Sequence, residues 1–187
     1  MQLITPSKWL ANLTKQSFLK EYPVDVIHNT IDTHVFKPTP SDLRERFMLQ
    51  NKFVLLGVAS IWGRRKGMDD FVKLASMLDE QYAIVLVGVS EKQKKSLPTQ
   101  IISVTRTNSP AELAQLYTMA DVFLNLTYED NYPTVNLEAQ ACGTPCITYR
   151  TGGSIESVPD ENIIEQGDLI ALQNKLSRML ENSKNGE

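Results

Sequence analysis

The sequence contains few cysteines and histidines and no long apolar run. Its 187 residues include two cysteines, Cys142 and Cys146, and two histidines, His28 and His34. Both cysteines lie in apolar surroundings, which favours buried free thiols over a disulfide or a metal-binding pair. No run of about 18 apolar residues is present, so we expect no membrane-spanning helix. The start, MQLITPSKWL, lacks the charged and apolar regions of a signal peptide, and we therefore expect a cytoplasmic protein.

Several motifs that carry well-known chemistry are also missing. The sequence has no GxGxxG and no GxxxxGK(S/T), so it predicts neither a dinucleotide fingerprint nor a P-loop. It has no Asp-x-Asp pair and no nucleophile turn for Ser/His/Asp chemistry. We therefore expect no metal site and no cofactor. The net charge of −3 argues against a nucleic-acid partner held mainly by electrostatics.

Short apolar runs alternate with helical patterns along most of the chain. This alternation is typical of βαβ units and predicts an α/β fold, a Rossmann-like doubly wound parallel sheet with helices on both faces. Residues 1–22 differ, because they predict a strand end, a cap at Ser7 and one amphipathic helix. The predicted strands are Val24–Ile27, Phe53–Ala59, Ala83–Val87, Ile101–Val104, Val122–Leu126 and Cys146–Tyr149, and the predicted helices are Met68–Leu78, Pro110–Met119, Pro133–Cys142, Ser154–Val158 and Asp168–Leu180.

Basic residues follow the predicted strand Phe53–Ala59. In open parallel sheets, ligands bind beyond the carboxyl ends of the strands, so the residues after each strand are candidates for a site. Arg64, Arg65 and Lys66 lie where the chain leaves this strand. Three adjacent cations at the edge of a sheet suit a phosphate ligand, although a solvated basic turn is the alternative.

The stretch YEDNYPTVNLE follows the strand Val122–Leu126 and leads into a helix. Pro133 fits the first helical position, where the missing N–H costs nothing. The amides of Thr134 and Val135 then have no partner inside the helix. These two amides predict an anion site.

Acidic residues surround this anion site. Glu138 lies four residues beyond Thr134 on the same helix face, where a carboxylate suits the hydroxyls of a ribose. Glu129 and Asp130, in the loop, can accept from a second set of hydroxyls. This order of hydroxyls, phosphates and hydroxyls is the layout of a nucleotide sugar. The alternative is that Asp130 and Asn131 cap the helix and Glu138 is a surface residue.

Two further features are weaker candidates. Gly152 and Gly153 precede a short helix, and they allow either close approach to a ligand or a tight turn. His28 and His34 lie in the loop after the first predicted strand and belong to no catalytic pattern of their own.

Three stretches together resemble group 1 of the retaining GT-B glycosyltransferases, a glycosyltransferase family 4-like group. They are the hinge-like VIHNTIDTHVFKP, the strand and basic loop GVASIWGRRKGMDDF, and the long ending from Pro110 to Glu156 with its spaced acids and its ACGTP turn. The resemblance covers nearly the whole chain. It implies the C-terminal half of a GT-B fold, with residues 1–22 as a remnant of the N-terminal acceptor domain and 23–187 as the nucleotide-sugar-binding domain.

The resemblance also implies roles for individual residues. Lys66 would neutralise the departing diphosphate, and Glu138 would hold the ribose. The first acid of the family's Glu-x7-Glu pattern contacts the sugar; that position holds Asp130, with Glu129 adjacent, so either acid could do so. An arginine common in the family is replaced by Ser60. The site residues expected in this way are Lys66, Arg65 and Asp130 as catalytic groups, and Ser60, Arg64, Glu129, Asn131, Pro133, Thr134, Val135 and Glu138 as donor-binding groups.

By the same resemblance we expect a bacterial, hexosyltransferase-like enzyme of polysaccharide or glycolipid synthesis. It would move a sugar, with retention, from a nucleotide-diphosphate sugar to a sugar or lipid-linked acceptor held by the missing domain. The full-length enzyme could associate with a membrane peripherally, and this chain alone would be inactive or weakly active. Backbone contacts around Arg106–Asn108 would read the base. Two alternatives stay open: another GT-B enzyme, such as a nucleotide-sugar epimerase or a phosphorylase-like synthase, and a non-catalytic nucleotide-binding α/β module.

Overall fold

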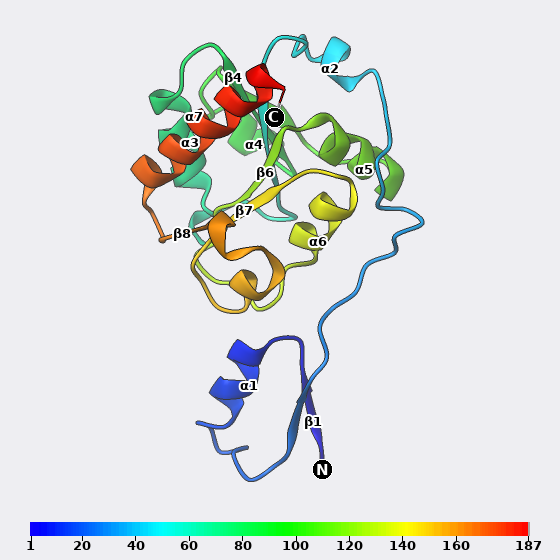
Figure 1. Cartoon of the computed structure of the whole chain (residues 1–187), viewed down its shortest axis with the longest axis vertical. Coiled ribbons are helices and arrows are strands. Elements are labelled where there is room, and N and C mark those ends of the chain that lie inside the picture. Colours follow the sequence, from blue (N-terminus) through cyan, green and yellow to red (C-terminus); the bar gives the residue numbers. More distant parts are fainter. Residues whose placement is uncertain (187) are drawn as a thin grey trace.

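A computed structural model describes residues 1–186, which form two units of unequal size (Figure 1). The smaller, N-terminal unit holds strand β1 (Leu3–Thr5), helix α1 (Lys8–Thr14) and strand β2 (Val24–Val26). Strands β1 and β2 form a separate two-stranded parallel sheet. Residues 27–42 then run along the larger unit to helix α2 (Leu43–Arg46).

Two predictions about this unit are confirmed. Ser7 caps α1, since its side chain accepts from the amide of Leu10 at 3.1 Å. The strand predicted at Val24–Ile27 is β2, and it pairs with β1 rather than with the main sheet. Its two valines are half-buried and alternate with the exposed Asp25, a pattern typical of a strand with one covered face. The boundary between the two sheets therefore falls between β2 and β3.

The larger unit is built on a six-stranded parallel sheet in the order β5-β4-β3-β6-β7-β8. Numbered within this sheet alone, the order is 3-2-1-4-5-6, which is typical of doubly wound nucleotide-binding folds. The predicted α/β fold with a parallel sheet is therefore confirmed. The strands are β3 (Phe53–Val58), β4 (Tyr82–Val87), β5 (Ile101–Val104), β6 (Val122–Asn125), β7 (Cys146–Tyr149) and β8 (Ile163–Ile164).

Helices cover both faces of this sheet. On one face α3 (Met68–Met77) and α7 (Leu169–Asn185) bury leucines such as Leu74, Leu172 and Leu176. On the other face lie α2, α5 (Pro110–Met119) and α6 (Thr134–Ala141). Because successive side chains of a strand point to opposite faces, the continuous apolar run of β3 supplies both cores. The shorter helices are α4 (Glu91–Lys94) and the 3-10 turns η1 (Arg64–Lys66), η2 (Ser154–Ser157) and η3 (Asp160–Asn162).

Most predicted elements of the larger unit occur within a few residues of their expected bounds. The helix predicted at Ser154–Val158 is the 3-10 turn η2, and α7 continues to Asn185 rather than ending at Leu180. Pro133 is not the first helical residue, because its ψ of 120° is extended and α6 begins at Thr134. Among residues 1–186 no helix is both long and apolar enough to cross a bilayer.

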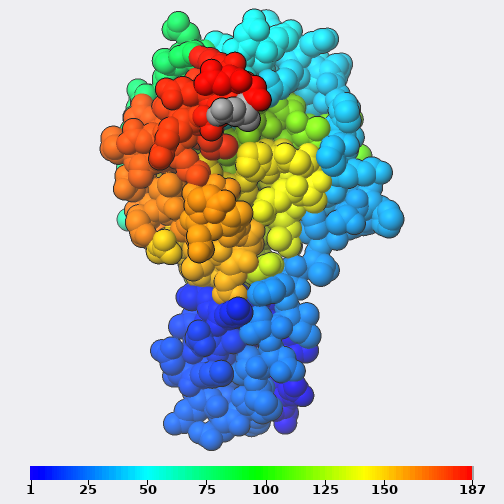
Figure 2. Space-filling model, in the orientation of Figure 1, coloured from blue at the N-terminus to red at the C-terminus, as the bar shows by residue number. Residues whose placement is uncertain are grey.

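The sheet order marks one place as a crevice for ligands. The chain steps from β3 to β4 in one direction, and it later returns to place β6 on the other side of β3. The loops after β3 and β6 therefore lead to helices on opposite faces of the sheet, α3 and α6. Figure 2 shows the N-terminal unit, in dark blue, as a separate lobe seated against the larger unit.

Candidate functional site

The basic loop after β3 is fixed against the loop after β6. It turns through η1 to Gly67, whose φ of 73° starts helix α3. A Cβ atom on Gly67 would lie 2.1 Å from the carbonyl oxygen of Leu126, so only glycine permits this approach. The amide of Tyr128 donates to the carbonyl of Arg65 at 2.8 Å. The two loops that leave the sheet at the crevice are thus in direct contact.

An ion pair joins these loops. The Nζ atom of Lys66 lies 2.5 Å from Oδ2 of Asp130, and the side chains are only 21% and 15% exposed. Oδ1 of Asp130 accepts from the amide of Asn131 at 2.9 Å, and the Arg65 guanidinium donates to the carbonyl of Glu129 at 3.2 Å. Because the Lys66–Asp130 pair is largely shielded from water, its attraction is stronger than that of an exposed pair. The structure therefore brings together five of the predicted residues: Lys66, Asp130, Asn131, Arg65 and Glu129.

The amino end of helix α6 lies directly beyond this pair. The helix begins at Thr134, and the amides of Thr134 and Val135 have no acceptor within the helix. Asn136, the next residue, donates its amide to the carbonyl of Pro133 at 3.3 Å. The positive end of the helix dipole therefore has no partner within α6, and the anion site at this end stays a prediction.

Glu138 lies one turn further along α6 and is partly buried. Its Oε2 atom accepts from the hydroxyl of Tyr117, on α5, at 2.9 Å. Burial raises the pKa of this carboxyl, and hydrogen bonds from Tyr117 and Thr134 partly offset the rise. Glu138 is thus held between two helices rather than free on the surface.

The raised pKa of Glu138 leads to a stability prediction. The folded chain binds the proton of Glu138 more tightly than the unfolded chain, so the free energy of unfolding falls as pH rises above the ordinary value of 4.5. We expect Glu138→Gln to raise the melting temperature at neutral pH, with a difference from wild type that shrinks below pH 4.5. Thermal denaturation across this range checks the prediction, and a pH-independent difference would contradict it.

Ser60 and Arg64 lie to either side of the ion pair. Ser60 lines a hollow of about 570 Å³ at the ends of β3 and β4, together with Trp62 and Gly88. Arg64 lines a smaller hollow of about 250 Å³ beside Tyr128. The structure places both residues on the crevice edge of the sheet but in different hollows.

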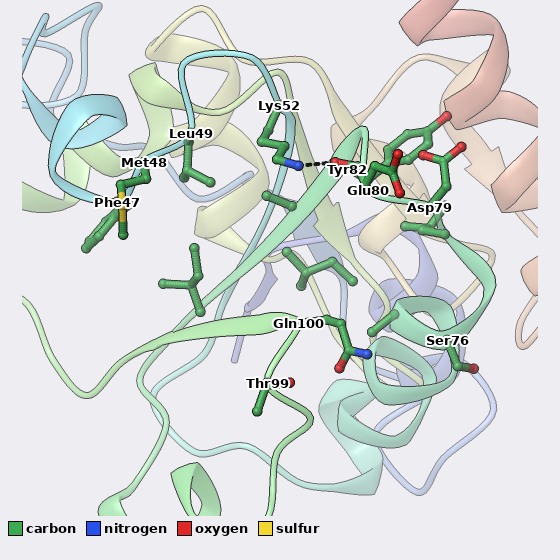
Figure 3. A pocket seen from close by; sticks show the side chains of 15 residues that line it. Phe47, Met48, Leu49, Lys52, Ser76, Asp79, Glu80, Tyr82, Thr99 and Gln100 are labelled. Atoms are coloured by element: carbon green, nitrogen blue, oxygen red, sulfur yellow. Dashed lines mark hydrogen bonds between the residues drawn. The ribbon is translucent and has the colours of Figure 1, made fainter.

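Another hollow, of about 620 Å³, lies at the opposite edge of the sheet, by the amino ends of β4 and β5 (Figure 3). Its lining includes Tyr82, at the start of β4, and Gln100, just before β5, together with Phe47 and Met48. It contains none of the predicted site residues. Its size alone therefore does not identify it as the site.

The N-terminal unit contacts the same loop that carries Asp130. The Ser7 hydroxyl donates to Oδ1 of Asn131 at 2.8 Å, so this predicted donor-binding side chain already has a protein partner. The carboxylate of Glu156 accepts from the amides of Lys8 and Trp9, both at 2.8 Å. These contacts join the first turn of α1 to the loops after β6 and β7.

His28 and the two glycines also support this junction. The His28 ring stacks on Tyr132 with centroids 4.5 Å apart. A Cβ atom on Gly152 would lie 2.0 Å from the carbonyl oxygen of Asp130, and one on Gly153 would lie 1.8 Å from that of Asn131. The glycine pair therefore allows protein backbone to approach the loop closely.

Sequence reasoning missed two residues that support the site. Tyr117 was not singled out, although it binds Glu138. The second is Asp70, in the first turn of α3, which is 3% exposed and accepts from the Tyr128 hydroxyl at 2.6 Å. That hydrogen bond is the main cause that raises the pKa of Tyr128 to about 12. The partners are 21 and 58 residues apart, and no local pattern links them.

The fold is that of a doubly wound α/β domain, and comparison with known proteins gives its family. Residues 42–187 match the family model of the glycosyl transferases group 1, and the chain belongs to this family.

Curated relatives are similar to the chain in sequence, and solved structures share its fold. The chain is 28% identical over 137 residues to alpha-galactosylglucosyldiacylglycerol synthase of Streptococcus pneumoniae, covering 65% of the chain and 36% of the relative. It is 25% identical over 197 residues to the N,N'-diacetylbacillosaminyl-diphospho-undecaprenol alpha-1,3-N-acetylgalactosaminyltransferase of Campylobacter jejuni, covering 98% and 52%. Sucrose-phosphate synthase from Thermosynechococcus elongatus superposes with a TM-score of 0.81 at 24% identity, covering 96% and 49%. Anabaena HepE in complex with UDP-glucose gives 0.81 at 20% identity, covering 98% and 55%. The chain thus spans about half or less of the length of these proteins.

Proposed function

We propose that the chain is the C-terminal, donor-binding domain of a retaining, family 4-like GT-B glycosyltransferase. The enzyme moves a sugar from a nucleotide-diphosphate sugar to a hydroxyl acceptor. The observation that carries this proposal is the Lys66–Asp130 ion pair, which joins the two loops of the crevice beside the amino end of α6. A cation, a carboxylate and free helix amides in one place suit a diphosphate with a sugar attached.

The chain would act on the reaction by electrostatic stabilisation. As the bond between the sugar and the diphosphate breaks, negative charge grows on the departing phosphate oxygen. Lys66 and Arg65, with the amides of Thr134 and Val135, are placed to stabilise that charge. Asp130 neutralises Lys66 in the free chain, and the diphosphate takes over this role when the donor binds. No catalytic base is needed from this chain.

The geometry favours Asp130 over Glu129 as the acid that meets the sugar. The Asp130 carboxylate lies inside the crevice against Lys66. Glu129 is exposed, and its contacts here are made by its carbonyl, which accepts from Arg65 and Thr127. Glu138, one turn inside α6, takes the ribose in this arrangement.

The rest of the enzyme would supply the acceptor. Residues 1–22 belong, in this proposal, to the acceptor domain, and the hydrogen bond from Ser7 to Asn131, the residue after Asp130, supports a position of that domain beside the crevice. The names of relatives from Streptococcus pneumoniae and Campylobacter jejuni include a glycolipid and an undecaprenol-linked sugar. We therefore propose a sugar or lipid-linked acceptor and a cytoplasmic enzyme that associates with the membrane surface.

Nucleotide binding by this chain tests the proposal. Thermal denaturation is measured with UDP, GDP, ADP and CMP, each without metal and with magnesium. We expect one nucleoside diphosphate to raise the melting temperature by a few degrees without metal, since a ligand at 100 times its Kd adds about 2.7 kcal/mol of stability. Glu138→Ala should abolish the shift, and the exposed Asp25→Ala should retain it. A melting temperature that no nucleotide changes would contradict the proposal.

A further inference from the structure

Tyr117 is a buried tyrosine whose hydroxyl has one fixed position. The residue is 0% exposed, near the end of α5. Its ring packs edge-on against Phe123, with centroids 5.4 Å apart, and against Phe36 at 6.3 Å. Its carbonyl accepts from the hydroxyl of Thr144 at 2.6 Å. Because both ring and backbone are held, the hydroxyl cannot move without disturbing the core.

This fixed hydroxyl sets the orientation of the Glu138 carboxylate. The hydroxyl of Tyr117 donates to Oε2 of Glu138 at 2.9 Å, from a neighbouring helix. A free glutamate side chain samples many rotamers, and the bond selects one of them before any ligand arrives. A carboxylate has about four acceptor positions, so Tyr117 and Thr134 leave capacity for two more donors. A ribose diol supplies two such donors.

We propose that Tyr117 is a positioning residue for the nucleotide: its buried hydroxyl orients the Glu138 carboxylate to accept from the ribose hydroxyls. The inference rests on the proposed function, because it assigns the ribose to Glu138. It adds a residue on another helix that touches no ligand and that acts through Glu138. The groups that face Glu138 in this arrangement are Tyr117 from α5, Thr134 from its own helix and the buried thiol of Cys142 at the end of that helix.

The test compares ribose recognition in Tyr117→Phe and wild type. Dissociation constants are measured for the nucleoside diphosphate that wild type binds and for its 2′,3′-dideoxy analogue. The variant keeps the ring and loses only the hydroxyl. We expect the ribonucleotide to bind about 10-fold more weakly to the variant, as loss of a hydrogen bond to a charged group predicts, with little change for the dideoxy analogue.

Tyr149→Phe is a matched control. Tyr149 is also 0% exposed, and its hydroxyl also donates to a carboxylate, that of Asp70, at 3.0 Å. The two variants thus lose the same group from comparable surroundings. The ratio of the dissociation constants of the ribonucleotide and its dideoxy analogue should change in Tyr117→Phe. It should stay at its wild-type value in Tyr149→Phe.

The pH dependence of ribonucleotide affinity is a second measurement, and a purely structural role of Tyr117 would leave it unchanged. The bond from Tyr117 lowers the pKa of Glu138, so its loss raises that pKa further. Ribonucleotide affinity, which needs the ionised carboxylate, should therefore decline at a higher pH in Tyr117→Phe than in wild type.

The outcomes separate this inference from the proposed function. If wild type binds no nucleotide, both are overturned. If wild type binds and Tyr117→Phe weakens the ribonucleotide and its dideoxy analogue equally, or leaves both unchanged, only this inference is overturned. An equal change of the ratio in Tyr149→Phe would overturn it as well.

Discussion

Lys66→Ala is expected to weaken binding of a nucleoside diphosphate by about 100-fold. The variant loses the charge-assisted hydrogen bonds of the ammonium group to phosphate, worth about 1.5–3 kcal/mol. It also leaves the carboxylate of Asp130, whose side chain is only 15% exposed, without its partner beside the incoming phosphates. Isothermal titration of wild type and variant with the preferred nucleotide measures the change.

Two further variants make this result specific. Lys73→Ala removes a lysine whose side chain is 67% exposed, 3.8 Å from Asp70, and should bind nucleotide as wild type does. In Lys66→Ala/Asp130→Ala the repulsion between carboxylate and phosphate is gone, so part of the lost affinity should return. If Lys66→Ala binds as tightly as Lys73→Ala, Lys66 does not contact the diphosphate.

Gly67→Ala is expected to destabilise the chain by about 3–5 kcal/mol, a large effect for one methyl group. The residue has a φ of 73°, which disfavours any side chain, and its Cβ would lie 2.1 Å from the Leu126 oxygen and 2.8 Å from the Leu126 Cβ. Because this carbonyl oxygen belongs to the backbone directly after β6, it cannot move away without displacing the loops of the crevice. Thermal denaturation should show a melting temperature about 10 °C lower.

Gly63→Ala is the matched control for this substitution. It lies in the same loop, its φ of −177° is extended, and a Cβ atom there would have no neighbour within 4 Å. Its melting temperature should stay within about 2 °C of wild type. If both variants lowered the melting temperature by the same amount, the contact between Gly67 and Leu126 would not be the cause of the loss.

Local sequence patterns predict most strands of the main sheet, but they do not predict its shortest strand or the partner of β2. The runs of β3 and β4 are continuously apolar because both faces are buried, and this signal is strong in sequence. Strand β8 has only two residues, Ile163 and Ile164, which is too short to show any period. The partner of β2 was missed because pairing is a long-range choice that half-buried valines do not specify.

The candidate site was predictable by position but not by contact. Parallel strands bring the loops after β3 and β6 to one edge, so grouping Lys66 with Asp130 followed from topology. No spacing in the sequence predicts that these two side chains, which lie 64 residues apart, form an ion pair. Similarly, Asn131 was predicted to bind donor, but its side-chain oxygen accepts from Ser7, which lies 124 residues earlier.

The capping of α1 by Glu156 has a consequence for the order of folding. Helix α1 has seven residues, fewer than the ~12–15 that an isolated helix needs, and a two-stranded sheet alone is also marginal. The amides of Lys8 and Trp9 find their acceptor 148 and 147 residues further along the chain. Contacts so distant in sequence carry a loop-closure entropy and form slowly. Although α1 precedes the main sheet in the chain, it completes its hydrogen bonds only after that sheet has brought Glu156 into place.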